Sequence, residues 1–268
     1  MTPHALAVAR LVTDLQRLGV REGDTLMVHA SLRALGPVED RAAGVIRALD
    51  TALGPSGTFM MVMGAQNDWD WVNERPEEER PALLANAEPF DALRTPAESD
   101  VSALAEVMRQ TPGTRVSNHP EGRFGARGAL AEHLLRDVPW NDYYGPGSPL
   151  ERFMRADGKV LRLGADISTV TLLHYAEYLA DVPSKRRVRR YRRVLNEHGT
   201  PEIRAVECLN DSEGIVAWDG EDYFGIILTE YLATGRAAQG VVGNARSELI
   251  NGADLVAFGT QWMNKHLG

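Results

Sequence analysis

Cysteine is nearly absent from the sequence, since Cys208 is the only one among 268 residues. A single cysteine makes no disulfide within a chain and leaves no thiolate cluster for structural zinc. Cys208 lies in a segment in which apolar and polar residues alternate. That setting favours a place in the core over a role as a nucleophile.

Long apolar runs and an excess of basic residues are also lacking. No stretch approaches the roughly 18 uninterrupted apolar residues that a transmembrane helix requires, and the N-terminus lacks the basic and then apolar plan of a signal peptide. The formal net charge of −8 repels nucleic acid and attracts a polycationic small molecule. We therefore expect a cytoplasmic protein that binds neither membranes nor nucleic acid.

Helical and strand-like patterns alternate along the chain. Hydrophobic residues make up 44% and charged residues 25% of the sequence, the mix of a globular protein with a sizeable core. We predict a single domain over residues 1–268 with an α/β fold: a central mixed sheet with covering helices and an additional antiparallel strand pair. The predicted helices are 6–18, 42–53, 101–110, 148–156, 168–180, 223–234 and 253–266. The predicted strands are 24–29, 58–63, 159–163, 188–194, 202–209 and 240–246.

Residues 65–100 interrupt this alternation with tryptophan, proline and many acids. A structureless connection of this length is uncommon in a compact domain, so we predict a functional loop. Ser99 or Asp100 is expected to cap the helix that follows, because either side-chain oxygen accepts from exposed first-turn amides. A second irregular segment, rich in glycine, is predicted at 117–128.

Several short motifs occur along the chain in the order and spacing of one protein family. They are Val28-His29-Ala30-Ser31-Leu32 with Gly36-Pro37, Ala52-Leu53-Gly54-Pro55 with Gly57-Thr58, Ser117-Asn118-His119-Pro120, Tyr144-Gly145 with Gly147-Ser148-Pro149-Leu150, Gly158-Lys159-Val160-Leu161 with Leu163-Gly164, Thr171-Leu172-Leu173-His174-Tyr175-Ala176-Glu177, Gly240-Val241-Val242-Gly243 with Ala245 and Ser247, and Asp254-Leu255-Val256. With these motifs the chain resembles the antibiotic N-acetyltransferases, which acetylate the 3-amino group of aminoglycosides. The match spans roughly residues 25–262, and the loop 68–86 departs from the family pattern.

The resemblance implies a fold, a reaction and a set of partners. The fold is that of an antibiotic N-acetyltransferase. The reaction transfers an acetyl group from acetyl-CoA to the 3-amino group of the 2-deoxystreptamine ring and confers antibiotic resistance. The partners are coenzyme A and an aminoglycoside antibiotic, no metal is expected, and the protein is a monomer or a homodimer. Residues 65–100 then form a substrate-binding insertion.

Thr171, His174 and Glu177 fall at i, i+3 and i+6 of one predicted helix, so adjacent members are neighbours on its surface. An imidazole takes up a proton near neutral pH, a carboxylate on its other nitrogen fixes its tautomer, and a hydroxyl can donate to an oxyanion. Periodicity alone favours a core histidine and a structural acid. The resemblance implies instead that His174 is the general base and that Glu177 supports it, with Asp166 as an alternative partner of the imidazole.

A loop or helix start with free backbone donors suits the phosphates and amides of coenzyme A. One such segment follows a predicted strand, and another begins a predicted helix. The resemblance implies that both lie along the coenzyme. Their residues are His29, Ala30, Ser31, Leu32, Arg33, Val101 and Ser102. Ser31 and Ser102 are alternatively simple parts of a helix start. Phe124, like His119, lies in the irregular segment 117–128 and is a further candidate for the cleft wall.

An aminoglycoside is a flexible polycation, so its site is expected to present carboxylates and an aromatic surface. Two acidic regions fit this description, although a surface acid in a loop is usually only solvated. The candidate substrate-binding residues are Asp68, Asp70 and Trp71 in the insertion, and Asp219, Glu221 and Asp222 near Tyr223.

The run 185–193 carries seven basic residues in nine positions. Such a run can neutralise coenzyme phosphates or solvate an edge strand, and we favour the edge strand.

Three other functions are compatible with the residues. A metal-dependent hydrolase could use His174, Glu177, His119 and Asp166 as ligands, although no close His-Glu-x-x-His motif is present. A non-catalytic protein could bind the coenzyme or the antibiotic without releasing a thiol. An acetyltransferase could also act on a different amine.

Overall fold

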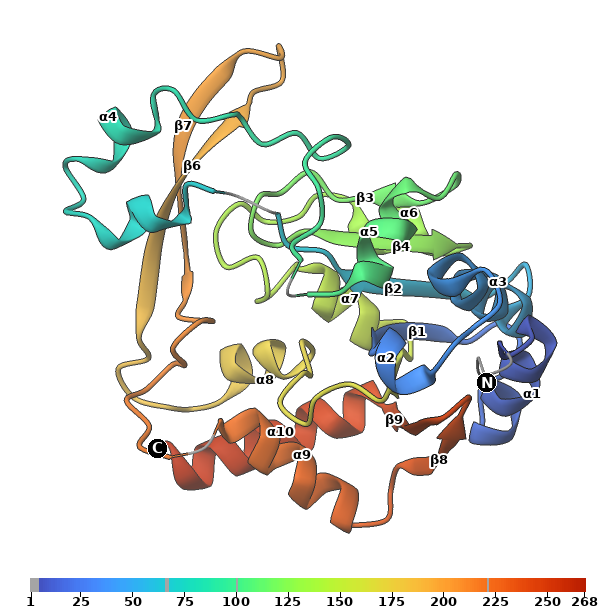
Figure 1. The fold of residues 1–268 in the computed structure, drawn as a ribbon. Helices are drawn as coiled ribbons and strands as arrows, with labels where there is room; N and C mark the ends of the chain where they lie inside the picture. Colours follow the sequence, from blue (N-terminus) through green and yellow to red (C-terminus); the bar gives the residue numbers. More distant parts are fainter. Residues whose placement is uncertain (1–4, 66–67, 100, 221) are drawn as a thin grey trace.

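The structure, a computed structural model, describes residues 5–65, 68–99, 101–220 and 222–268. Its centre is a seven-stranded sheet with the order β3-β4-β2-β1-β5-β9-β8 (Figure 1). β1 pairs in parallel with β2 and β5, and the other pairs of the sheet are antiparallel, which confirms the predicted mixed sheet. The strands are β1 (Thr25–Ala30), β2 (Thr58–Val62), β3 (Arg115–Val116), β4 (Phe124–Gly128), β5 (Lys159–Leu163), β8 (Ala238–Val242) and β9 (Ala245–Asn251).

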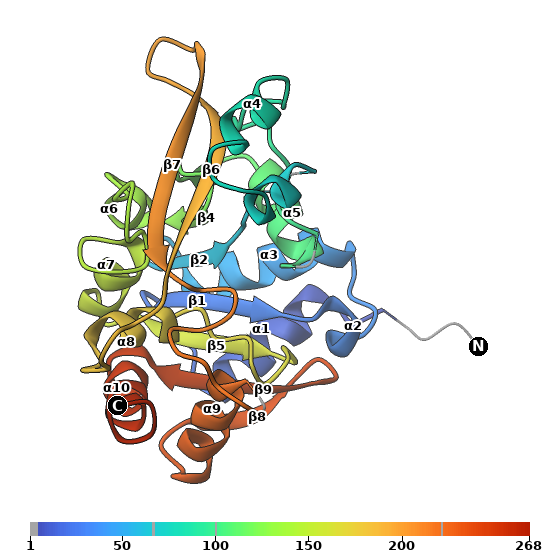
Figure 2. The same cartoon turned by 90° about the vertical axis from the view of Figure 1, so that its left-hand side faces the viewer.

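Helices cover both faces of the sheet, because its central strands are apolar on both sides. In β1, Leu26 and Val28 belong to one hydrophobic core and Met27 to the other. The first core includes α1 (Val8–Leu18), α2 (Leu32–Leu35), α3 (Arg41–Leu53) and α5 (Ala103–Gln110). The second includes α6 (Ala131–Leu135), α7 (Pro149–Arg155), α8 (Leu173–Leu179), α9 (Tyr223–Ala233) and α10 (Gly252–His266). Figure 2 shows α3 and α5 on one side of the strands and α6, α7 and α10 on the other.

Strands β6 (Arg187–Leu195) and β7 (Pro201–Leu209) form the predicted separate antiparallel pair, which extends away from the sheet (Figures 1 and 2). The insertion 65–100 packs against this hairpin and contains the 3-10 helix η1 (Asp70–Glu74) and the helix α4 (Arg80–Leu84). Its Val72 and Leu84 form a small core against which Tyr191 of the hairpin packs. The insertion is therefore a folded segment that packs on the hairpin.

Arg123 holds the main chain of the insertion in place. Its side chain is fully buried, and its guanidinium donates to the carbonyl oxygens of Gly64, Ala92, Thr95 and Pro96 at distances of 2.6 to 3.0 Å. Gly64 directly precedes the insertion, and the other three oxygens lie near its end. One buried side chain therefore holds both ends together.

Two strand assignments from the sequence need correction. The segment predicted to be irregular contains β4, in which Gly125 lies so close to the Met63 side chain that a Cβ would meet it at 1.8 Å. The strand predicted at 240–246 is a hairpin of β8 and β9, which turns at Gly243 with a φ of 60°. In both cases glycines that weaken a strand pattern are needed for close packing or for the turn.

Two helix starts also differ from the prediction. α5 begins at Ala103, and its cap is Ser102, whose hydroxyl accepts from the Leu104 amide at 3.0 Å. Asp100 lies outside the described residues. α8 begins at Leu173, so Thr171 precedes the helix and does not stand on its face.

Candidate active site

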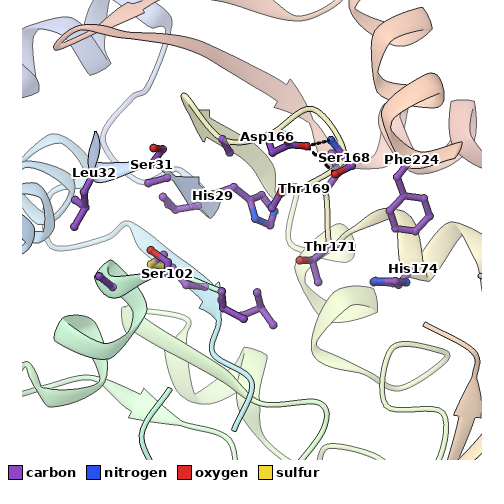
Figure 3. A pocket seen from close by; sticks show the side chains of 18 residues that line it. His29, Ser31, Leu32, Ser102, Asp166, Ser168, Thr169, Thr171, His174 and Phe224 are labelled. Atoms are coloured by element: carbon purple, nitrogen blue, oxygen red, sulfur yellow. Dashed lines mark hydrogen bonds between the residues drawn. The ribbon is translucent and has the colours of Figure 1, made fainter. Parts of the chain in front are cut away.

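His174, in the first turn of α8, lines three adjoining cavities. The first cavity has a volume of about 580 Å³ and lies beyond the end of β1, where His29 to Leu32 form part of its wall (Figure 3). The second, of about 350 Å³, is bordered by the insertion and β6, and the third, of about 300 Å³, by the start of α9. A group bound in any of the three would meet the same imidazole.

A buried carboxylate holds one nitrogen of this imidazole. Nδ1 of His174 lies 2.8 Å from Oε2 of Glu177, and the hydroxyl of Tyr223 donates to Oε1 of the same carboxylate. Glu177 is 1% exposed, so its charge acts on the imidazole with little screening by water. With Nδ1 engaged in this way, Nε2 is the nitrogen left for a substrate.

Burial and charge act in opposite directions on the pKa of His174. Burial lowers this pKa, but the negative charge of Glu177 and its hydrogen bond outweigh the burial and raise the pKa above its ordinary value. Asp211 and Asp222 add to the rise. The imidazole is therefore a better proton acceptor than a free histidine.

Two aromatic rings fix the plane of the imidazole. The ring of Tyr144 stacks on it with a centroid distance of 5.0 Å and an interplanar angle of 11°. Phe224 approaches edge-on at 4.8 Å and 62°. His174 therefore has little freedom to turn. Neither ring was predicted from the sequence as part of the site.

The partner of the imidazole is Glu177 in this geometry, not Asp166. Asp166 accepts instead from the amide and the hydroxyl of Ser168, at 3.0 and 2.8 Å. Thr171 lies with His174 on the wall of the first cavity (Figure 3). Both side chains line the cavity even though Thr171 precedes α8.

The residues predicted for the coenzyme divide into three groups. His29, Ala30, Ser31, Leu32, Val101 and Ser102 line the first cavity. Arg33 is exposed and does not line that cavity. Phe124 is fully buried under Tyr144, with ring centroids 6.0 Å apart, so it belongs to the core and does not form a cavity wall.

Ser31 and Ser102 combine the two roles considered for them. The hydroxyl of Ser31 accepts from the Ala34 amide at 3.2 Å, as Ser102 does at the start of α5. Both side chains nevertheless line the first cavity. Because a cap uses the hydroxyl only as an acceptor, its hydrogen remains available as a donor.

His29 is a buried polar side chain with an unpaired ring nitrogen. It is 4% exposed, lines the first cavity, and its Nε2 has no hydrogen-bond partner among the described residues. Burial, with a smaller effect of the Arg162 charge, lowers the pKa of His29 to about 3, so the imidazole is neutral. An unpaired buried polar group typically costs about 1–3 kcal/mol.

Carboxylates surround the second and third cavities. Three of those in the second cavity were not predicted, because each comes from a different part of the chain. The acids of the second cavity are Asp70, Glu98, Glu121 and Asp211, and those of the third are Glu177, Asp211, Glu213 and Asp222. Asp211 belongs to both. A polar residue just after the end of a predicted strand is the signal that would have indicated it.

Two arginines of β6 also face the second cavity. Arg190 pairs with Asp211 at 2.7 Å, and Arg192 pairs with Glu121 and with Asp70 of the insertion. Their side chains are 13% and 10% exposed, so the preferred prediction of a solvated edge strand is wrong for both. Partial burial raises the pKa of the Asp211 carboxyl, but the Arg190 charge outweighs this effect, so the pKa is lowered.

Only some of the residues predicted to bind the substrate line these cavities. Asp70 lines the second cavity and Asp222 the third. Asp222 also caps α9. Asp68 lines a neighbouring cavity of about 480 Å³, Trp71 is 41% exposed and stacks on Trp69, and Asp219 is exposed outside the second and third cavities. Glu221 lies outside the described residues.

His119 has a structural role in this arrangement. It is 1% exposed, its Nε2 lies 2.9 Å from the Trp140 carbonyl oxygen, and its Nδ1 accepts from the amides of Glu121 and Gly122. These bonds fix the turn that carries Glu121 to the second cavity. His119, Asp166 and His174 do not come together as ligands, and the described part of the chain contains no group of three or more such side chains that could hold a metal ion.

Solved structures of acetyltransferases share this fold. The structure named "AAC-IIIb binary with CoASH" superposes with a TM-score of 0.92 at 38% identity and covers 99% of this chain and 98% of that one. The neutron/X-ray structure of sisomicin-bound AAC-VIa gives 0.91 at 36% identity, with 99% and 100% covered. The fold is therefore that of the aminoglycoside acetyltransferases, as the resemblance implies.

The sequence comparison narrows this class to one family. Aminoglycoside N(3)-acetyltransferase III of Serratia marcescens is 38% identical over 272 residues, which cover 97% of this chain and 98% of the relative. Aminoglycoside N(3)-acetyltransferase VII of Streptomyces paromomycinus is 37% identical over 270 residues, with 97% and 92% covered. The profile of the aminoglycoside 3-N-acetyltransferase family matches residues 27–264, and the chain belongs to this family. Along the described ranges no helix has the length and apolar character needed to cross a membrane.

Proposed function

We propose that this protein transfers the acetyl group of acetyl-CoA to the 3-amino group of the 2-deoxystreptamine ring of aminoglycosides, with His174 as general base. The observation that carries the proposal is the position of His174. Its imidazole, held by the buried Glu177, lines both a cavity with few charges and cavities rich in carboxylates. The names of the relatives point to the same reaction.

The coenzyme occupies the first cavity in this proposal. A relative of known structure is named as a complex with CoASH. The pantetheine arm passes the loop at the end of β1 and the start of α5, where Ser31 and Ser102 offer their hydroxyl hydrogens. Its thioester then lies near Thr171 and His174, which share a wall of the cavity.

The antibiotic occupies the second and third cavities. Its ammonium groups pair with carboxylates there, above all Asp70, Asp211 and Asp222, which turn the ring so that one nitrogen faces His174. Relatives named as complexes with sisomicin and with a gentamicin support an acceptor of this class.

His174 takes the proton of the attacking amine while Glu177 stabilises the imidazolium that forms. The Thr171 hydroxyl donates to the oxyanion that develops on the thioester carbonyl. Acetylation removes one positive charge and one donor from the drug. Its contacts with RNA phosphates and base edges are weakened as a result, and resistance follows.

A thiol-release assay tests the reaction. The purified protein is incubated with acetyl-CoA and either aminoglycosides or simple amines, and the product of a 4,6-disubstituted aminoglycoside is analysed by NMR. We expect thiol release with the antibiotic and an acetyl group on the 3-nitrogen. An acetyl group at the 6′ or 2′ nitrogen would contradict the regiochemistry, release with simple amines alone would indicate another acceptor, and binding without release would indicate a non-catalytic protein.

A further inference from the structure

His29 differs from three other polar side chains that line the first cavity. Ser31 and Ser102 accept hydrogen bonds from helix amides, and His174 is bonded to Glu177. The buried Nε2 of His29 has no such partner among the described residues. A buried polar atom on a cavity wall is normally satisfied by what the cavity binds.

The position of His29 limits what that bound group can be. It stands near the end of β1 opposite Arg162 of β5, and its ring projects into the cavity between Ser31 on one side and Thr171 and His174 on the other (Figure 3). The acyl end of the coenzyme must lie on the path towards His174 for an amine to reach it. His29 therefore faces this end of the arm.

We propose that the imidazole of His29 donates a hydrogen bond to the carbonyl oxygen of the acetyl thioester. The proposal rests on the function proposed above and adds a second donor beside Thr171. Aliphatic side chains such as Val28 and Met61 form other parts of this cavity wall.

The charge of His29 suits this role. Its pKa of about 3 keeps the ring neutral, so it keeps its proton and does not compete with His174 as a base. The charged groups near it are Arg162 on the adjacent strand and Asp166, which lines the same cavity. A neutral imidazole is an established electrophile in other enzymes, because it donates to a developing oxyanion without giving up its hydrogen.

The transfer step balances in atoms and electrons. The lone pair of the amine nitrogen forms a bond to the acetyl carbon, and the carbonyl π electrons move to the oxygen, which accepts from His29 and Thr171. The proton of the amine passes to His174. The carbonyl forms again, the bond from carbon to sulfur breaks, and the thiolate of coenzyme A takes the proton from His174.

Replacing the donor tests this role. We expect His29→Leu to lower kcat by about a hundredfold, the scale of a lost oxyanion donor. The Kd of coenzyme A, measured by calorimetry, should change less than about threefold, since coenzyme A has no acetyl carbonyl. His29→Gln should restore much of kcat, because its amide can donate from near the position of Nε2.

The pH profile and the controls separate this role from simple packing. Because His29 is neutral where His174 titrates, His29→Leu should lower the plateau of the rate profile without moving its inflection. His198→Leu, in the exposed turn of the β6–β7 hairpin, is a matched control for histidine removal, and thermal melting checks the fold of every variant. A kcat within twofold of wild type in His29→Leu, a loss of coenzyme A affinity as large as the loss of kcat, or no recovery in His29→Gln would overturn the proposal. Absence of acetyl transfer by the wild-type protein would instead contradict the proposed function.

Discussion

The first and second cavities share His174 but differ in charge. The first has His29 and Asp166 as its other titratable side chains, and its remaining polar groups are hydroxyls. The second is lined by four acids and two arginines, which leaves a negative excess. His174 thus lines a cavity with one carboxylate and a second cavity with four.

This difference matches two opposed requirements of acetyl transfer. The thioester oxygen and the leaving sulfur become negative during the reaction, so nearby carboxylates would raise the barrier. The ammonium groups of the acceptor are positive and need carboxylates to orient them. In the proposed function, separate cavities keep the two sets of charges apart, and His174, which lines both, takes the proton between them.

Removal of His174 should have the largest effect on this arrangement. We expect His174→Ala to lower kcat at least about a hundredfold, since a general base contributes roughly a hundredfold to ten-thousandfold. The affinities for coenzyme A and for the antibiotic, measured separately by calorimetry, should stay close to those of the wild type. Near wild-type turnover of this variant would show that the proton leaves by another route.

Glu177→Gln should have a smaller effect on turnover and a distinct one on pH dependence. His174 must be neutral to accept a proton, and its raised pKa means that the rate increases with pH through an inflection above the ordinary histidine value. Loss of the carboxylate removes the charge that raises this pKa, so the inflection should move to lower pH. We expect kcat to fall about 10- to 100-fold, the scale seen when the carboxylate partner of a metal-bound histidine is lost.

The same pH series would also show if this prediction is wrong. An unchanged profile and an unchanged kcat in Glu177→Gln would mean that a different acid orients the imidazole.

Removing a negative charge from the second cavity should change the KM of the antibiotic more than kcat. We expect Asp211→Asn to raise the KM of the antibiotic about tenfold, because one carboxylate is lost and Arg190 is left with less compensation near the ligand. The KM for acetyl-CoA should be nearly constant. Added salt should also weaken antibiotic binding more than coenzyme binding in the wild type, and less so in this variant.

Asp219→Asn is the matched control for this prediction, since Asp219 is an exposed acid outside the second and third cavities. Equal effects of the two substitutions on KM would indicate attraction by the net charge of the protein. A loss confined to kcat in Asp211→Asn would place this acid in the chemical step.

Structural features that depend on residues close together in the sequence could be predicted. β5 was predicted with its observed bounds, because Val160, Leu161 and Leu163 between two glycines give a clear strand signal. The contact of His174 with Glu177 also follows from a spacing of three residues on a helix. Such predictions need no knowledge of the tertiary structure.

Features set by distant parts of the chain were not accessible. Glu98, Glu121 and Asp211 meet only after the insertion has packed on β6. The arginines of β6 were misjudged for the same reason, since the acids that pair with Arg190 and Arg192 lie far away in the sequence. A run of like charges does not reveal whether its partners are water or buried carboxylates.

The way in which Arg123 holds the insertion has a consequence for how this protein can change. All four of its acceptors are main-chain oxygens, which every amino acid supplies. Side chains of the insertion can therefore be exchanged while the segment keeps its course. The side chains of the insertion that border the second cavity can therefore vary independently of the main chain. If the antibiotic binds there as proposed, substitutions in the insertion would change which antibiotics bind without altering the surroundings of His174.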